Sequence, residues 1–476
     1  MSLSKRILAW CTALILVILW FGPPAAASGV KRFRKGYRLD QNGWVYIHIE
    51  GAPYERGYQH GYLVAPELKR ILRSLKYLTY FNTGKKWEFF VAAAEQLWVK
   101  WIDDEYIQEI KGIAAGATAA GTPITWQEVL AWNGYEELMD YWWPNAISKY
   151  RYAPRFPAAN DHCSGFIATG KATKHGLIVM AHNSWDNFET GQFMNLILDI
   201  VPDKGNRIFM QSQAGYIDSM SDFFVTSAGI MGTETTIGGF SLYDPNEAPE
   251  FFRVRKAMQY ATDLKQFMHL MRKQNNGGYA NSWLLGFVKT GEIVRFELGL
   301  RFAGVKHKTD GWFIGFNAPI DPRIRNLECS NTGYADIRRH QGARQVRLTQ
   351  LMRQYSGHID VEVAKKILAD HYDVYLGKIN PCSRTVDGHY ELDPRQFMSD
   401  PSRPKPFQPR GTVDGKVMDS TMATALSFWA RWGNSSGMPF EASAFLAKHI
   451  QWEYLRGYLL DRPSQPWVKF RAGQLK

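Results

Sequence analysis

The 476-residue sequence lacks several features that mark common protein classes. It has no fixed-period repeat and no low-complexity segment, which argues against solenoid and disordered architectures. Neither a C-x-x-C nor an H-E-x-x-H motif occurs, so the usual sequence signals of a zinc site are missing. After residue 21, no apolar run approaches the roughly 20 residues that a membrane-spanning helix needs. We therefore expect a soluble globular protein with no metal and no organic cofactor.

The N-terminus has the pattern of a secretory signal. A basic pair at residues 5 and 6 precedes an apolar run over residues 7–21, and Ala25 and Ala27 follow at the positions expected before a cleavage site. We predict a signal peptide over residues 1–27, with an uncleaved membrane anchor as the alternative, and a secreted or periplasmic location. Asn434 begins the only N-x-[ST] sequence, which favours a bacterial envelope protein; in a eukaryotic host we expect the lysosome.

Cysteine is scarce, with four residues in the chain. Cys11 lies within the predicted signal, so Cys163, Cys329 and Cys382 remain in an oxidising compartment. The simplest division of this odd number is one disulfide, Cys329 to Cys382, and one free thiol, Cys163.

The formal net charge is +12 at pH 7. The basic residues are scattered along the chain and form no recognition motif for nucleic acid. We therefore expect no nucleic-acid partner and a generally solvated basic surface. Contact with an anionic membrane surface is the alternative.

The pattern of elements changes at Cys163. Before it, residues 44–50 alternate like one strand, residues 65–145 indicate helices, and residues 145–162 indicate a loop. Thr125 and Glu128 form a capping-box pattern at the start of one helix. After it, strand-turn-strand pairs are expected over 163–183, 195–213, 222–237 and 282–299, and helices over 250–274, 341–355 and 360–371. Strands flanked by helices indicate an α+β layered fold, with an N-terminal segment over 28–162 and a second unit over 163–476.

Cys163 is a candidate nucleophile, but its neighbour His162 is not a suitable base for it. Adjacent residues on an extended segment point to opposite sides, so His162 is badly placed to act as the base for Cys163. The strand-like sequence after Cys163 also disfavours a papain-like site, in which the cysteine begins a helix. Cleavage between His162 and Cys163 would instead give Cys163 a free α-amino group, whose usual pKa of about 7.7–8 suits a base.

Several ordered motifs resemble one known family. They are His162-Cys163-Ser164, residues 181–185 (AHNSW), residues 214–238 ending in ETTIG, residues 276–283 (NGGYANSW), residues 342–348 (GARQVRL) and residues 411–423 (GTVDGKVMDSTMA). Together they are similar to the phospholipase B-like family of N-terminal-nucleophile hydrolases. Residues 54–61 and 110–138 look more like acyltransferases and hydrolases of the penicillin-acyltransferase type.

The resemblance implies a four-layer αββα sandwich and a self-cleaved protein whose two chains, 28–162 and 163–476, stay associated. It implies release of fatty acyl chains from phospholipids through a thioester on Cys163. The acyltransferase-like residues 54–61 and 110–138 imply an alternative reaction, hydrolysis or transfer of an N-acyl amide. The expected partner is therefore an acyl lipid or an N-acyl small molecule. A lipid- or glycan-binding protein without activity is a further alternative.

The resemblance also implies a role for individual residues. Cys163, His182 and Asn281 would be the nucleophile, the group that orients or polarises the new amine, and the oxyanion donor; Trp185, Thr235, Thr236 and Arg344 would line or anchor the substrate site. One departure from the family pattern is that its paired asparagines appear here as Ala280-Asn281. Each residue has a structural alternative, since His182 and Trp185 are also ordinary core residues and Thr235 and Thr236 are common in strands.

Overall fold

The computed structural model describes residues 29–148, 163–220, 223–330, 332–395 and 405–475. The predicted signal peptide over 1–27 and His162 of the predicted cleavage site lie outside these residues. Among the helices that are described, none combines the length and the apolar character needed to cross a bilayer.

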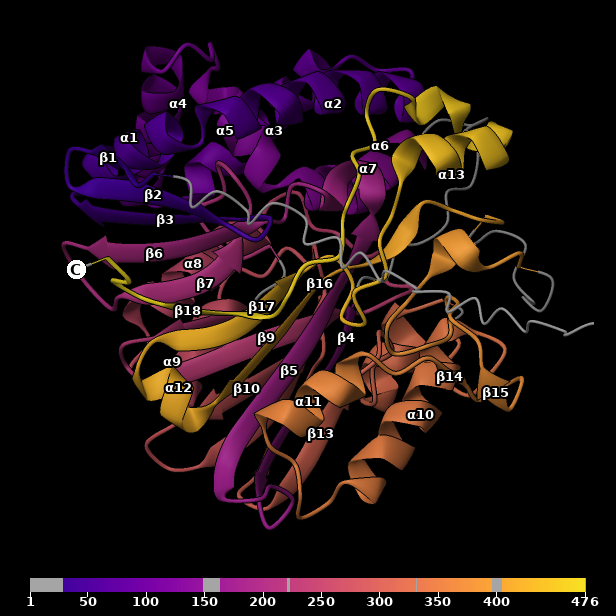
Figure 1. Ribbon diagram of the computed structural model, residues 1–476. Coiled ribbons are helices and arrows are strands. Elements are labelled where there is room, and N and C mark those ends of the chain that lie inside the picture. The colour runs from indigo at the N-terminus through magenta and orange to yellow at the C-terminus, as the bar shows by residue number, and fades with distance from the viewer. Residues whose placement is uncertain (1–28, 149–162, 221–222, 331, 396–404, 476) are drawn as a thin grey trace, which may run out of the picture.

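Two large β-sheets form the centre of the molecule (Figure 1). The ten-stranded sheet runs β1 (Lys31–Phe33), β2 (Gly36–Gln41), β3 (Trp44–Gly51), β6 (Leu196–Pro202), β7 (Ile208–Ser212), β8 (Phe224–Thr226), β9 (Ile230–Thr236), β10 (Asn281–Phe287), β11 (Glu292–Leu298) and β12 (Ala303–Lys308). The six-stranded sheet runs β13 (Gly311–Gly315), β4 (Cys163–Gly170), β5 (Gly176–Asn187), β16 (Arg410–Asp419), β17 (Ser427–Trp432) and β18 (Val468–Arg471).

The two sheets pack face to face. Gly286 of β10 faces the small sheet so closely that an added Cβ atom would lie 3.2 Å from Ile167 Cδ1 of β4. Helices α1 (Pro53–Leu63), α8 (Glu250–Tyr260) and α9 (Leu264–Arg272) contact the ten-stranded sheet, whereas α10 (His340–Gln354) and α11 (Val361–Leu368) contact the six-stranded sheet (Figure 1). The α+β sandwich predicted from the sequence is confirmed.

Most of the local predictions match elements of the structure. The four strand-turn-strand pairs are β4–β5, β6–β7, β8–β9 and β10–β11, all antiparallel. The capping box is present, with Thr125 and Glu128 bonded reciprocally at the start of α5 (Trp126–Asn133). The single helix expected over 250–274 is two helices, because the chain turns at Ala261 and the Asp263 carboxylate caps α9 by accepting from the Gln266 amide.

The segment before Cys163 is more than a helical unit. Its strands β1, β2 and β3 belong to the ten-stranded sheet, and β3 pairs in parallel with β6. Its helices α2 (Ala65–Thr83), α3 (Trp87–Trp98) and α4 (Asp104–Ala119) then extend the layer that α1 begins (Figure 1). The N-terminal segment therefore shares one sheet with residues that follow Cys163.

Helices α1 and α4 approach each other through glycines. A Cβ atom at Gly61 would overlap the carbonyl oxygen of Ile113, and one at Gly116 would overlap the carbonyl oxygen of Tyr58. Both atoms belong to the backbone of the opposite helix, which a rotamer change cannot move aside. The contact therefore requires glycine at these positions, as in other close helix packings.

We expect Gly116→Ala to destabilise the protein by about 1–3 kcal/mol, because the overpacked helix pair must separate. Ala119→Ser, at an exposed position of the same helix, is the matched control and should change stability by less than about 0.5 kcal/mol. The measurement is the shift of the thermal unfolding midpoint of each purified variant. Equal midpoints for Gly116→Ala and the wild type would contradict the packing argument.

Candidate active site

Cys163 is the first residue of β4, and its side chain is buried. The strand that follows is buried on both faces: Ile167 packs between the sheets, whereas Phe166 and Ala168 pack on the side of α10 and α11. Strands β13 and β5 flank β4, and Cys163 lies opposite Ser184 of β5. The cysteine therefore lies at the first residue of an inner strand of the six-stranded sheet.

The backbone of Cys163 is held from both sides. Its nitrogen donates to Asn317 Oδ1 at 3.1 Å, and its carbonyl oxygen accepts from the Arg344 guanidinium. Arg344 Nη1 also donates to Ser164 Oγ at 3.1 Å, and Nη2 donates to Asn317 Oδ1 at 2.9 Å. Asn317 in turn donates from Nδ2 to the carbonyl oxygen of Thr236 at 2.7 Å. These bonds tie the first residue of β4 to the facing sheet.

Arg344 and Trp185 form one packed unit behind Cys163. Arg344 projects from α10, is fully buried, and lies with its guanidinium carbon 4.0 Å from the centroid of the Trp185 ring. Trp185 of β5 also contacts Tyr390 edge-on, with ring centroids 5.7 Å apart. The structure thus brings both predicted residues to Cys163, with Arg344 bonded to its carbonyl oxygen.

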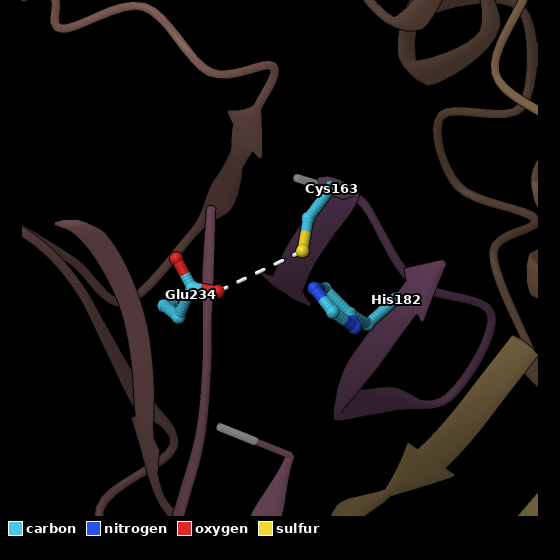
Figure 2. Close-up of side chains that lie close together, drawn as sticks. All are labelled: Cys163, His182 and Glu234. Atoms are coloured by element: carbon cyan, nitrogen blue, oxygen red, sulfur yellow. Dashed lines mark hydrogen bonds between the residues drawn. The ribbon is translucent and has the colours of Figure 1, made fainter. Parts of the chain in front are cut away.

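The thiol of Cys163 faces a carboxyl group and an imidazole (Figure 2). Cys163 Sγ lies 3.6 Å from Oε1 of Glu234 in β9, and a ring nitrogen of His182 in β5 is within 4.8 Å of both atoms. Glu234 also accepts hydrogen bonds from the hydroxyl groups of Tyr279 and Thr236, each at 3.4 Å. His182 was predicted from the sequence; Glu234 was missed.

Burial sets the charge state of this cluster. It raises the pKa of the Cys163 thiol well above its usual value, with Glu234 adding to the shift. It also raises the pKa of Glu234 to about 8, opposed by the hydrogen bond from Cys163. The pKa of His182 is lowered by burial and by the nearby Lys416. Near neutral pH, the thiol is therefore protonated and the imidazole is uncharged.

A buried ion pair lies beside the cluster. Lys416 of β16 is opposite His182, and its Nζ donates to Asp414 Oδ1 and to Ser184 Oγ, each at 2.5 Å. Burial lowers the pKa of Lys416, while Asp414 opposes that shift.

Cys163, His182 and Glu234 are close enough to hold a metal ion. The Lys416 ammonium beside them disfavours that use, because two cations repel strongly in a buried site.

Asn281 and the two threonines lie at the same end of the large sheet. Asn281 is opposite Thr236 and is buried, and neither Oδ1 nor Nδ2 of its amide has a hydrogen-bond partner among the residues that the structure describes. Buried amide groups are nearly always bonded, so this amide is available to a ligand. Thr235 instead packs against Gly165 and Gly315 of the small sheet.

Sequence reasoning missed four polar residues of this site: Glu234, Asn317, Asp414 and Lys416. A weak signal exists for three of them, because each is a charged residue within a strand whose other positions are buried. Asn317 follows β13 and has a positive φ of 63°, which asparagine tolerates better than most residues.

The predicted disulfide between Cys329 and Cys382 is wrong, because both are free thiols in the structure. Cys382 is buried beside the β14–β15 hairpin (Tyr372–Asp373 and Lys378–Ile379), with its sulfur 3.5 Å from Asp373 Oδ2. Cys329 is half-buried and pairs through its backbone with Phe240. The two cysteines thus pack in different surroundings, which a count of cysteines does not reveal.

Comparisons with known proteins point to one family. The sequence profile of the family described as Phospholipase B matches residues 74–293, from within α2 to β11. An uncharacterized protein of Archaeoglobus fulgidus is 26% identical over 290 residues, which are 55% of this chain and 45% of that protein. "Phospholipase B" of Crotalus adamanteus is 25% identical over 300 residues, 56% of this chain and 51% of that protein. The chain thus spans about half the length of these relatives.

A longer match extends over most of the chain. "Phospholipase-B 81" of Drysdalia coronoides is 23% identical over 459 residues, 84% of this chain and 79% of that protein. The matches confirm the resemblance to phospholipase B-like proteins that the motifs indicated. The profile also covers residues 110–138, which look like acyltransferases in the sequence, as well as Cys163, His182, Glu234 and Asn281.

The raised pKa of Glu234 predicts a pH-dependent part of the stability. A carboxyl group whose pKa rises from 4.5 to about 8 on folding stabilises the fold fully below pH 4.5 and loses that contribution as the pH rises to about 8. We expect Cys163→Ala/Glu234→Gln to lose less stability between these pH values than Cys163→Ala alone. The measurement is the unfolding midpoint as a function of pH.

The alanine at position 163 removes the thiol from both proteins, so that only the carboxyl group differs between them. Glu88→Gln in the same background is the matched control, because Glu88 is exposed. Parallel pH profiles for Cys163→Ala with and without Glu234→Gln would show that Glu234 ionises normally in the folded protein.

Proposed function

The chain is related to the phospholipase B family, and on that premise we propose that it is a self-processing acyl hydrolase that uses Cys163 as its nucleophile. The observation that carries the proposal is the hydrogen bond from the Cys163 nitrogen to Asn317 Oδ1. This bond and that of Arg344 to the Cys163 carbonyl oxygen hold the residue in place whether its nitrogen is an amide or a terminal amine.

The first reaction is cleavage of the chain itself. Cys163 Sγ attacks the carbonyl carbon of His162, and the thiol proton passes to the ionised form of Glu234, which is the minor form at neutral pH because the pKa is about 8. The C–N bond breaks, the nitrogen of Cys163 takes up the proton and becomes an amine, and a thioester remains. Water then hydrolyses the thioester, which releases the carboxylate of His162 and restores the thiol.

The second reaction uses the new terminus. The α-amino group, held by Asn317, removes the proton of the thiol, and the thiolate attacks an acyl carbonyl. The amide of Asn281 donates to the oxyanion, since its Nδ2 has no other partner among the described residues. The amine returns the proton to the leaving alcohol. Water then hydrolyses the thioester and releases the fatty acid.

His182 acts as a positioning residue in this scheme. Its uncharged ring lies against Gly165, next to the thiol, where a protonated imidazole would compete with the amine for the sulfur. Burial lowers the pKa of His182, and charge repulsion from Lys416 on the neighbouring strand lowers it further, so the imidazole stays neutral. The arrangement leaves the α-amino group as the base of the reaction.

The substrate class comes from the relatives' names. Relatives named phospholipase B favour an acyl lipid, presented by a membrane or micelle surface, as substrate. The same thioester chemistry would serve an N-acyl amide, which is the alternative substrate. Action in a secreted, periplasmic or lysosomal compartment agrees with the predicted signal.

We expect the mature protein to consist of two associated chains of 135 and 314 residues, covering 28–162 and 163–476. Mass spectrometry under denaturing conditions measures this directly. Cys163→Ala should stay a single chain, and Asn317→Leu should slow cleavage because it removes the acceptor for the Cys163 nitrogen. Cys329→Ser, at a cysteine outside the site, is the matched control and should be cleaved normally. An uncut wild-type chain would refute self-processing.

We also expect the processed protein to release fatty acid from phosphatidylcholine in mixed micelles. Asn281→Leu should lower kcat by about 10²–10³-fold through loss of the oxyanion donor, with cleavage of its own chain reported separately by mass. Cys163→Ala should be inactive and Cys329→Ser fully active. Assays with an N-acyl amide of the same chain length decide between the two substrate classes. Absence of turnover on either would favour a protein that binds lipid without catalysis.

A further inference from the structure

A second cluster of ligand-type side chains lies away from Cys163, on the chain between α11 and β16. His371, Asp387 and His389 direct one nitrogen or oxygen atom each toward a common point, and these atoms lie within 4.8 Å of one another. The proposed hydrolase chemistry uses none of them. Asp387 and His389 are buried, whereas the side chain of His371 is 14% exposed, so one side of the cluster is open to solvent.

The separations between the three atoms match one coordination geometry. His371 Nε2 and His389 Nε2 are 3.1 Å apart, and Asp387 Oδ2 is 3.3 Å from the first and 3.6 Å from the second. Around a zinc ion with bonds of about 2.05 Å, two ligands of a tetrahedron are about 3.3 Å apart. An octahedral ion with bonds of the same length needs neighbouring ligands about 2.9 Å apart. All three measured separations exceed the octahedral value.

Neighbouring groups hold the side chains of His389 and Asp387 in the orientation that metal ligands need. Glu391 Oε1 lies 2.8 Å from His389 Nδ1, which leaves Nε2 as the free donor of that ring. A carboxylate on the outer nitrogen is a usual feature of metal-bound histidines. Asp387 accepts from the backbone nitrogens of Ser435 at 3.3 Å and Ser436 at 2.9 Å, so its carboxylate is fixed. The two carboxylates also supply negative charge for a dication.

We propose that His371, Asp387 and His389 bind a tetrahedral divalent transition metal ion of the zinc class, with the fourth position open to water. Two ring nitrogens facing each other at 3.1 Å are readily explained if each donates a lone pair to the same ion. The proposal departs from the sequence analysis, which expects no metal because the ligands here are spread over nineteen positions without a recognised motif.

The ion would tie together two parts of one long loop, which packs on the six-stranded sheet. His371 follows α11, whereas Asp387 and His389 flank Gly388, which packs so closely on the ring of Trp185 that an added Cβ atom would lie 2.5 Å from it. Trp185 supports Arg344, which holds Cys163. A bound ion would therefore hold the loop that backs the candidate active site.

The test is metal binding by the purified protein after treatment with a chelator. Equilibrium dialysis against Zn²⁺, followed by elemental analysis, should give one ion per chain, and Co²⁺ should give the visible absorption of a tetrahedral nitrogen and oxygen site. The measurement is made in Cys163→Ser, which removes the thiol of the other cluster. His371→Ala/His389→Ala should abolish both signals, and His175→Ala, at an exposed histidine, should change neither.

Glu391→Gln is the second variant, because loss of a buried histidine can disturb the loop by itself. It keeps all three ligands, and we expect its affinity for Zn²⁺ to fall about 10–100-fold while its unfolding midpoint without metal stays close to that of the wild type. Zn²⁺ should raise the unfolding midpoint of the wild type and not that of the double variant. Failure of the Cys163→Ser protein to bind one ion, or unchanged binding when His371→Ala/His389→Ala is added to it, would overturn the proposal.

Discussion

The guanidinium of Arg344 holds the start of β4, where Cys163 lies, against the loop after β13. It donates to the carbonyl oxygen of Cys163, to Ser164 and to Asn317, while its face lies on Trp185. A buried guanidinium costs several kcal/mol unless its donors are satisfied, and charge-assisted hydrogen bonds to oxygen are the stronger kind. Because three of these acceptors belong to the start of β4 and the loop after β13, their relative positions depend on one side chain.

The same region buries polar side chains between the two sheets, which costs free energy of folding. Between two packed sheets one expects apolar side chains, yet Cys163, His182, Glu234 and Lys416 share the interior with Asp414. Burial keeps the thiol protonated and the imidazole neutral, so the cluster holds one formal ion pair, Lys416 with Asp414. Polar interiors that break packing rules in this way are typical of functional sites, where stability is sacrificed for chemistry.

The fold was predictable from the sequence wherever the determining interactions are local. Alternation and turn residues predict the hairpin of β4 and β5, and the Thr125 capping box predicts the start of α5. The long-range strand pairings could not be predicted in this way. Lys416 comes to lie opposite His182 only because β16 pairs with β5 across more than 200 residues of chain, and no local pattern encodes that register. The predicted disulfide was wrong for a related reason, since counting cysteines says nothing of their spatial separation.

The parallel pairing of β3 with β6 has a consequence for how the molecule is made. These two strands lie on opposite sides of Cys163 in the sequence but are adjacent inside one sheet. In an uncut chain they meet at the modest entropic cost of closing a loop. Once severed ahead of Cys163, a denatured protein would have to reunite two separate chains, each with exposed strand edges that favour aggregation. Folding would then be a one-way event: the native state would persist because it unfolds slowly, not because it could form again.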